Sequence, residues 1–164
     1  MPSYRVQPIE PDLAWRVRAT LRSPGYDYPA YVDLATAEGP CRVCLNPFRS
    51  GADRAVWFVY DPARGRGPGP VPGPVQIHEE GCQAYRSITP SPVTGLDPAL
   101  LRSGCGLLLQ GFSACPQGGG TALESADGAD ALGAALTRLF AEPSIEYVHV
   151  RRADDGCFLY EVTC

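Results

Sequence analysis

Lysine is absent from this chain of 164 residues, and all 14 of its basic residues are arginines. Without lysine the protein cannot form a Schiff base with a substrate carbonyl, and it cannot supply the lysine of a phosphate-binding P-loop. The net charge is −4 and the arginines are scattered along the chain, which argues against nucleic acid or an anionic membrane surface as a partner. These absences exclude several classes of function before any motif is considered.

Long hydrophobic runs are missing as well. No segment approaches the ~20 apolar residues that a membrane-spanning helix needs, and the first residues, MPSYRVQPIEP, lack the apolar core of a signal peptide. We therefore expect a cytoplasmic protein. The seven cysteines should then be thiols or metal ligands, and their odd number fits poorly with a complete set of disulfides.

Length and composition predict a single domain over residues 1–164, with 45% hydrophobic and 20% charged residues. The segment 62–74, PARGRGPGPVPGP, is rich in proline and glycine. Within the domain it predicts either a mobile loop or a polyproline-like flap.

Two or three helices are expected. Residues 130–143 place several apolar side chains on one helical face, and 96–103 begin with Asp-Pro, a favourable helix start. Residues 11–21 are ambiguous, because their alternation resembles a strand. The i, i+4, i+8 spacing of Leu13, Val17 and Leu21 favours a helix there.

Strands account for most of the remaining pattern, and residues 23–40 are expected to be a loop. The pair 145–152 and 157–163, joined by a short turn, predicts a C-terminal β-hairpin. The whole order indicates an α+β fold with a mostly antiparallel sheet. Further strands are expected at 4–9, 54–61, 75–78, 105–114 and 121–125.

Four residues have the types and spacing of a zinc site. Cys41 and Cys44 lie in GPCRVC, and His78 and Cys82 lie in IHEEGC. Three thiolates and one imidazole suit tetrahedral zinc, and a site with four protein ligands would be structural. Two alternatives remain open, buried thiols and a redox pair. Pro47 disfavours the redox pair, because a redox CxxC normally opens a helix.

The C-terminal hairpin carries a second candidate set, His149, Arg151 and Cys157. A cysteine beside arginines can have a lowered pKa and react as a nucleophile. The three side chains would line a ligand site for a small anionic or acyl substrate, with Arg64 and Arg66 closing over it. An ordinary polar sheet face explains the same residues. No nucleotide cofactor motif occurs, since QGGGT lacks the strand and helix context of a phosphate loop.

Several segments together resemble a bacterial family known as domain of unknown function 1203. The resemblance covers roughly residues 35–163 and assigns no activity. Many members carry a C-R-x-C element and an H-x3-C element, while others replace the second cysteine of the first. The segments that carry it are GPCRVCL, AVWFVYDP, GPVQIHEEGCQAY, LLLQGF and LFAEPSIEYVHVRRADDGCFLYEV.

These observations predict a small accessory or interaction protein with a structural zinc ion. Its partner would be another protein, either a second copy of itself or a larger biosynthetic enzyme of which it is a subunit. The alternative is a small enzyme that uses the hairpin residues. Whether the protein is an enzyme is left open by its sequence.

Overall fold

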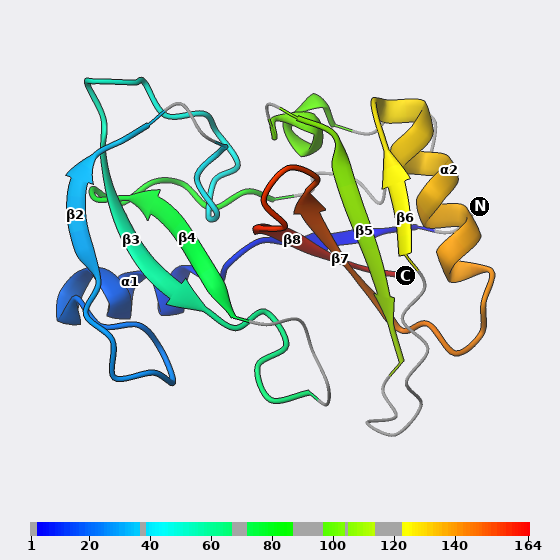
Figure 1. Cartoon of the computed structure of the whole chain (residues 1–164), viewed down its shortest axis with the longest axis horizontal. Helices are drawn as coiled ribbons and strands as arrows, with labels where there is room; N and C mark the ends of the chain where they lie inside the picture. The colour runs from blue at the N-terminus through cyan, green and yellow to red at the C-terminus, as the bar shows by residue number, and fades with distance from the viewer. Residues whose placement is uncertain (1–2, 37–38, 67–71, 87–96, 104, 114–122) are drawn as a thin grey trace.

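The computed structural model describes residues 3–36, 39–66, 72–86, 97–103, 105–113 and 123–164 (Figure 1). Its strands form two sheets in which every pairing is antiparallel, in the orders β1-β8-β7-β5-β6 and β2-β3-β4. This arrangement confirms the predicted α+β class and the C-terminal hairpin, and it divides the expected sheet in two. The strands are β1 (Arg5–Gln7), β2 (Tyr31–Leu34), β3 (Arg54–Tyr60), β4 (Gly73–His78), β5 (Leu107–Phe112), β6 (Leu123–Ala126), β7 (Tyr147–Arg152) and β8 (Phe158–Thr163).

The helix α2 (Ala129–Phe140) covers one face of the five-stranded sheet (Figure 1). Its buried leucines, Leu132, Leu136 and Leu139, pack with apolar side chains of β5 and β7 in one core. Gly111 in β5 makes room for Ile145, which precedes β7 and joins the same core, because a Cβ at Gly111 would lie 2.9 Å from Cδ1 of Ile145. The helix predicted over 130–143 is confirmed.

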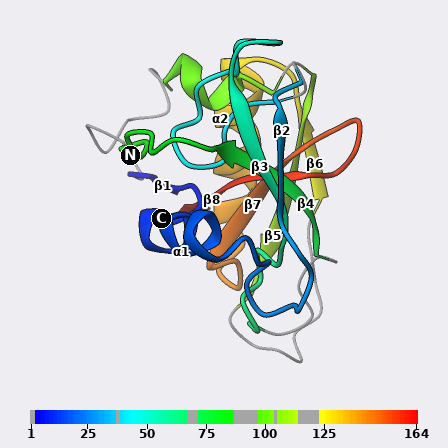
Figure 2. The same ribbon diagram turned by 90° about the vertical axis from the view of Figure 1, so that its left-hand side faces the viewer.

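The helix α1 (Pro11–Thr20) lies beside the three-stranded sheet, which faces the viewer in Figure 2. Ala14 and Val17 are buried in a core that includes strand residues of β3 and β4. Trp15 is 67% exposed, so the alternating apolar residues that resembled a strand do not form a single buried face. The helix ends where Leu21 takes a left-handed conformation with φ of 49°. The helical interpretation of 11–21 is therefore confirmed.

Some local predictions are wrong or change in extent. β2 lies inside the segment expected to be a loop; it is a four-residue edge strand with mostly exposed side chains, so it lacks the pattern of a buried strand. β4 begins at Gly73, so part of the proline-rich segment is a strand. Pro74 is tolerated there because β4 is also an edge strand.

The predicted helix at 96–103 is a 3-10 helix, η1 (Pro98–Leu101), with the side chain of Asp97 accepting a hydrogen bond from the Ala99 amide. Residues 67–71, 96, 114 and 121–122 of the predicted elements lie outside the described residues. Within the described part of the chain, no helix is long and apolar enough to span a bilayer.

Contacts also join the two sheets. The rings of Tyr60 and Phe158 lie 5.4 Å apart, and Nε of Arg42 donates to the carbonyl of Phe158 at 2.6 Å. The single domain over residues 1–164 stays a prediction.

Candidate metal centre

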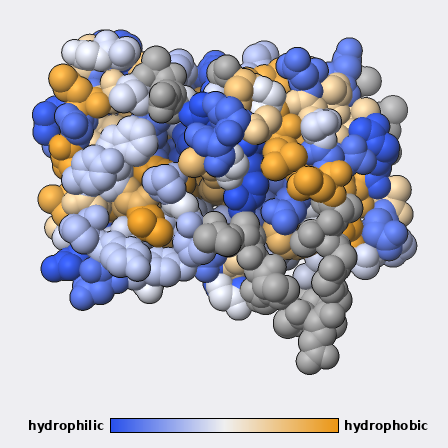
Figure 3. Space-filling model, in the orientation of Figure 1, coloured by the Kyte–Doolittle hydropathy of each residue, from blue (hydrophilic) through white to orange (hydrophobic). Residues whose placement is uncertain are grey.

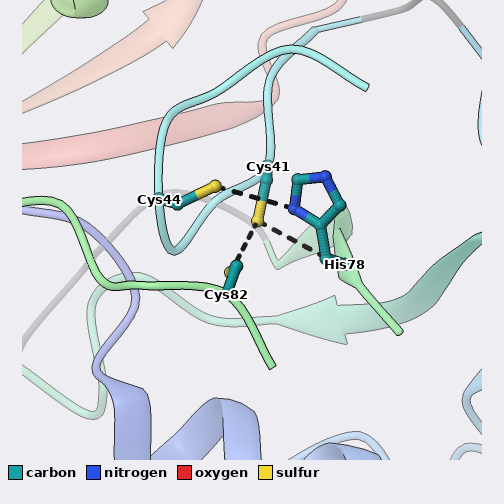
Figure 4. A group of neighbouring side chains, drawn as sticks. All are labelled: Cys41, Cys44, His78 and Cys82. Carbon is teal, nitrogen blue, oxygen red and sulfur yellow. Dashed lines mark hydrogen bonds between the residues drawn. The ribbon is translucent and has the colours of Figure 1, made fainter. Parts of the chain in front are cut away.

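Cys41, Cys44, His78 and Cys82 converge at one end of the three-stranded sheet (Figure 4). Their ligand atoms all lie within 4.8 Å of one another. Sγ of Cys41 is 3.8 Å from Sγ of Cys82, and Sγ of Cys44 is 3.6 Å from Nδ1 of His78. A tetrahedral zinc ion has Zn–S bonds of about 2.3 Å and Zn–N bonds of about 2.0 Å, which give S···S edges of about 3.8 Å and S···N edges of about 3.5 Å. The group could hold a metal ion.

A tight turn presents the first two cysteines. The Cys41 amide donates to the Asn46 carbonyl, the Leu45 amide donates to the Cys41 carbonyl, and Leu45 adopts a φ of 58°. The amides of Val43 and His78 point at Sγ of Cys41, at 3.5 and 3.4 Å. These donors stabilise negative charge on the sulfur, as a metal-binding thiolate requires.

The second pair of candidate ligands follows β4. His78 is the last residue of that strand, and the segment Glu79–Gly81 returns the chain so that Cys82 faces Cys41. β4 pairs with β3 through its whole length, and β3 is the buried strand predicted from the apolar run 54–61. The three-stranded sheet thus brings His78 and Cys82 close to Cys41 and Cys44, although the two pairs are far apart in sequence.

The four groups influence one another's protonation. Hydrogen bonds from the thiols of Cys44 and Cys82 lower the pKa of Cys41 despite its burial. Hydrogen bonds with Cys41 and Cys82 raise the pKa of Cys44, and the hydrogen bond with Cys41 raises the pKa of Cys82. The hydrogen bond with Cys41 also raises the pKa of His78. Cys41 is therefore the favoured thiolate, and metal binding would release protons from the other groups.

Two further side chains surround the cluster, and sequence patterns did not indicate either of them. Arg18 of α1 donates through Nε to the His78 carbonyl at 2.8 Å, and its Nη2 lies 3.7 Å from Sγ of Cys82. Asp53 places Oδ2 3.7 Å from Nε2 of His78, on the opposite side of the ring from the sulfurs. Arg49 holds that carboxylate with contacts of 2.7 and 3.0 Å. A carboxylate behind a histidine ligand is a common support for a bound metal.

A pocket of about 530 Å³ opens beside the cluster, and Cys44, His78 and Cys82 are among its lining residues. Its arginines, Arg49 and Arg54, are engaged in ion pairs with acidic neighbours. The pocket therefore offers an access route for an ion, and its lining charges are largely compensated.

His149 occupies a closed environment within the five-stranded sheet. It is fully buried, and its Nε2 lies 3.2 Å from Oε2 of Glu161 on β8. Arg66 forms an ion pair with the same carboxylate and lies over the ring of Tyr147, at 4.1 Å from its centroid. Burial lowers the pKa of His149. Burial raises the pKa of Glu161, but its hydrogen bonds with His149 and Arg66 bring it below the usual value.

The structure brings Arg151 and Cys157 together but leaves His149 apart from them. Both line a pocket of about 300 Å³, and His149 does not. The pKa of Cys157 is raised, first by burial and then by Asp155, whereas the sequence suggested that it could be lowered. Of the two loop arginines expected to close over a ligand, Arg66 binds Glu161 and Arg64 binds Glu10. The ligand-binding role of this set stays a prediction.

The chain is similar to a known protein family over most of its length. A family model described as "Protein of unknown function (DUF1203)" matches residues 39–164. No curated protein and no solved structure matches the chain. The matched segment contains all four candidate ligands, whereas β1, α1 with its Arg18, and β2 lie before it.

Proposed function

The chain belongs to the DUF1203 family of proteins of unknown function, and we propose that it is an accessory protein whose three-stranded half is stabilised by one structural zinc ion. Cys41, Cys44, His78 and Cys82 would supply all four ligands. With no coordination position left for water or substrate, the ion would contribute to folding and not to a reaction.

The observation that carries the zinc assignment is the match between donor type and spacing. Thiolates and imidazole select zinc over magnesium or calcium, which prefer oxygen ligands. Two of the six separations between ligand atoms, 3.8 and 3.6 Å, match the edges of a zinc tetrahedron to within about 0.1 Å, and all six are at most 4.8 Å. Asp53 behind His78 and Arg18 beside Cys82 add the outer support that such sites use.

Zinc would join three segments that also meet through hydrogen bonds and apolar packing. These are the turn that holds Cys41 and Cys44, the end of β4, and the segment beginning at Cys82. That last segment runs back across the turn, since the Tyr85 amide donates to the Val43 carbonyl. The ion would therefore fix the path by which the chain leaves the three-stranded sheet.

Elemental analysis of untagged protein tests the assignment. We expect about one zinc per chain, and we expect Cys44→Ser to lose it and to lower the Tm by about 10 °C, because loss of a structural zinc costs several kcal/mol. Cys164→Ser is the matched control, because Cys164 is exposed at the C-terminus. The proposal would be refuted if wild-type protein contained no metal and Cys44→Ser were as stable as wild-type protein.

The accessory role is supported by aromatic side chains exposed around β2. Tyr28 and Tyr31 are 57% and 60% exposed, and Tyr31 stacks on Trp57 with ring centroids 6.4 Å apart. Exposed rings beside an edge strand are typical of protein-binding surfaces. In the view of Figure 3, hydrophobic groups are interspersed with hydrophilic residues over the described surface. A protein partner is proposed; its identity as a larger biosynthetic enzyme stays a prediction.

Paired affinity purifications test this role, with wild-type and Tyr31→Asp proteins as baits. We expect the wild-type chain to retain one reproducible partner in stoichiometric amount and the variant to lose it. Sedimentation of the purified chain separates a second copy of itself from a foreign partner. Equal retention by both baits would contradict the role of this surface.

A cytoplasmic location is part of the same proposal. All six cysteines of the described chain are free of disulfide bonds. Three of them, Cys41, Cys44 and Cys82, belong to the candidate metal cluster. Free thiols in this number are typical of a reducing compartment.

A further inference from the structure

Arg151 of β7 has a guanidinium that the protein satisfies only in part. Its Nη1 donates to the Gly156 carbonyl at 2.7 Å. Its Nε and Nη2 are buried, and neither has a hydrogen-bond partner among the residues that the structure describes. Burial lowers the pKa of Arg151 despite the opposing effect of Cys157, and Arg151 forms no ion pair with the described residues. A buried cation without a counter-ion is costly, so such a group needs a partner.

Neighbouring arginines show the usual solution. Arg152, the next residue, pairs with Asp154 at 2.6 Å and with Asp155 at 3.6 Å. Arg66 pairs with Glu161. Unlike these two arginines, Arg151 forms no ion pair within the described chain, and unlike the buried Arg42, whose guanidinium donates to the carbonyls of Pro40 and Phe158, it leaves two buried nitrogens unpaired.

The two free donors of Arg151 form one edge of the guanidinium. The N–H bonds of Nε and Nη2 run parallel, and this edge binds the two oxygens of a carboxylate side by side. The Nη1 contact with Gly156 leaves that edge unused.

Arg151 also lines the pocket of about 300 Å³ between the two sheets. Its walls are mainly apolar and aromatic, and 300 Å³ is the lower limit for small-molecule sites. The apolar lining residues are Tyr60, Pro62, Pro72, Pro74, Val75 and Phe158.

We propose that this pocket binds the carboxylate of a small organic acid, with the Nε–Nη2 edge of Arg151 holding both oxygens and the apolar walls holding a short hydrocarbon tail. Because the two nitrogens are covered, the guanidinium turns toward the pocket as the ligand enters. The site is separate from the zinc cluster, and the proposal does not depend on zinc.

The charges around the pocket favour a singly charged ligand. Its other charged lining residue is Asp155, whose Oδ1 accepts from the Cys157 amide at 2.8 Å. One cation facing one carboxylate at the rim gives little net attraction for a phosphate dianion. A carboxylate with an apolar tail matches both the charge and the walls.

The test is a titration of the 15N-labelled full chain with butyrate, followed by NMR of the arginine Nε–Hε signals. We expect the Arg151 signal to shift saturably with butyrate and to stay in place with butyramide, which has the same shape and no charge. A tripeptide with a free C-terminus, compared with its C-terminal amide, distinguishes a chain end from a free acid as the source of the carboxylate. Saturable binding of either carboxylate supports the site.

Two variants locate the binding. Arg151→Gln should weaken butyrate binding about tenfold or more, because charge-assisted hydrogen bonds are lost, while Arg16→Gln, which removes an exposed arginine of α1, should not. Gly73→Leu should block the pocket with Arg151 intact, since a Cβ at Gly73 meets no atom within 4 Å and the larger side chain can therefore extend into the pocket.

Failure of both carboxylates to bind the wild-type chain would overturn the proposal. Unchanged binding by Gly73→Leu, or binding of inorganic phosphate alone, would do the same.

Discussion

The two sheets of this protein solve the same problem, buried polar groups, in different ways. In the five-stranded sheet, the buried pair His149 and Glu161 is completed by Arg66, so protein groups satisfy one another. In the three-stranded sheet, three thiols and an imidazole face a common centre, with weak sulfur hydrogen bonds between them. The first sheet therefore satisfies its buried polar groups with its own side chains, whereas the end of the second would, under our proposal, be completed by an ion.

Chelation should produce the largest effect and should be local. We expect removal of zinc to lower the free energy of opening around His78 and Val43 by about 5 kcal/mol. This is less than the 10–16 kcal/mol of zinc-finger peptides, because the core of α1 and β3 remains. Hydrogen exchange measures it, with amides of β7 and β8 as the internal reference. Equal loss of protection in both sheets would contradict the proposal that the ion stabilises only the three-stranded sheet.

Truncation of the other core comes next in size. Leu136 of α2 is 2% exposed, and Leu136→Ala should cost about 3 kcal/mol through lost burial and the cavity left behind. Urea unfolding should give the same cost in zinc-loaded and in chelated protein, because distant sites act additively. A cost that depends on zinc would show that the two sheets are energetically coupled.

The buried ion pair should contribute less than Leu136. Glu161→Gln removes the negative charge that both His149 and Arg66 contact, and we expect a loss of about 2 kcal/mol at pH 7.5. Glu146→Gln is the control, since Glu146 is exposed on the connection before β7. Equal stability of the two variants would contradict the role of the pair.

The same cluster predicts a direction for the pH dependence. The folded pKa of His149 lies below its usual value of about 6.5, and that of Glu161 lies below about 4.5. In both cases the unfolded chain binds protons first as the pH falls, so stability is full above these values and decreases below them. Chemical unfolding should show a loss beginning below about pH 6.5. Glu161→Gln should remove the part below about pH 4.5 that comes from Glu161 and enlarge the part that comes from His149, because Glu161 raises the pKa of His149.

Sequence patterns were sufficient to predict features that are encoded within one short segment of the chain. The apolar face of α2, the strand pair β7–β8 and the CxxC spacing are each contained in a short window, and the structure has them. β2 could not be predicted, because its side chains are mostly exposed and only its pairing with β3 defines it. The partners Arg18 and Asp53 lie in other segments and meet the cluster only through folding.

Glu161 is an intermediate case. The predicted hairpin already places it near His149, and the observed register pairs the two residues directly. Glutamate on the strand opposite His149 is therefore the signal from which sequence reasoning could have found this partner.

The smallest expected effect concerns the thiols outside the cluster, and it separates an accessory protein from an enzyme with a nucleophilic cysteine. Burial and Asp155 raise the pKa of Cys157, so little of it is thiolate at pH 7 and it should react with iodoacetamide more slowly than the exposed Cys164. Mass spectrometry of digested protein measures each cysteine separately, and chelation should add Cys82 to the reactive set without changing Cys157. Alkylation of Cys157 faster than Cys164 would contradict the raised pKa and would favour an enzyme that uses the hairpin.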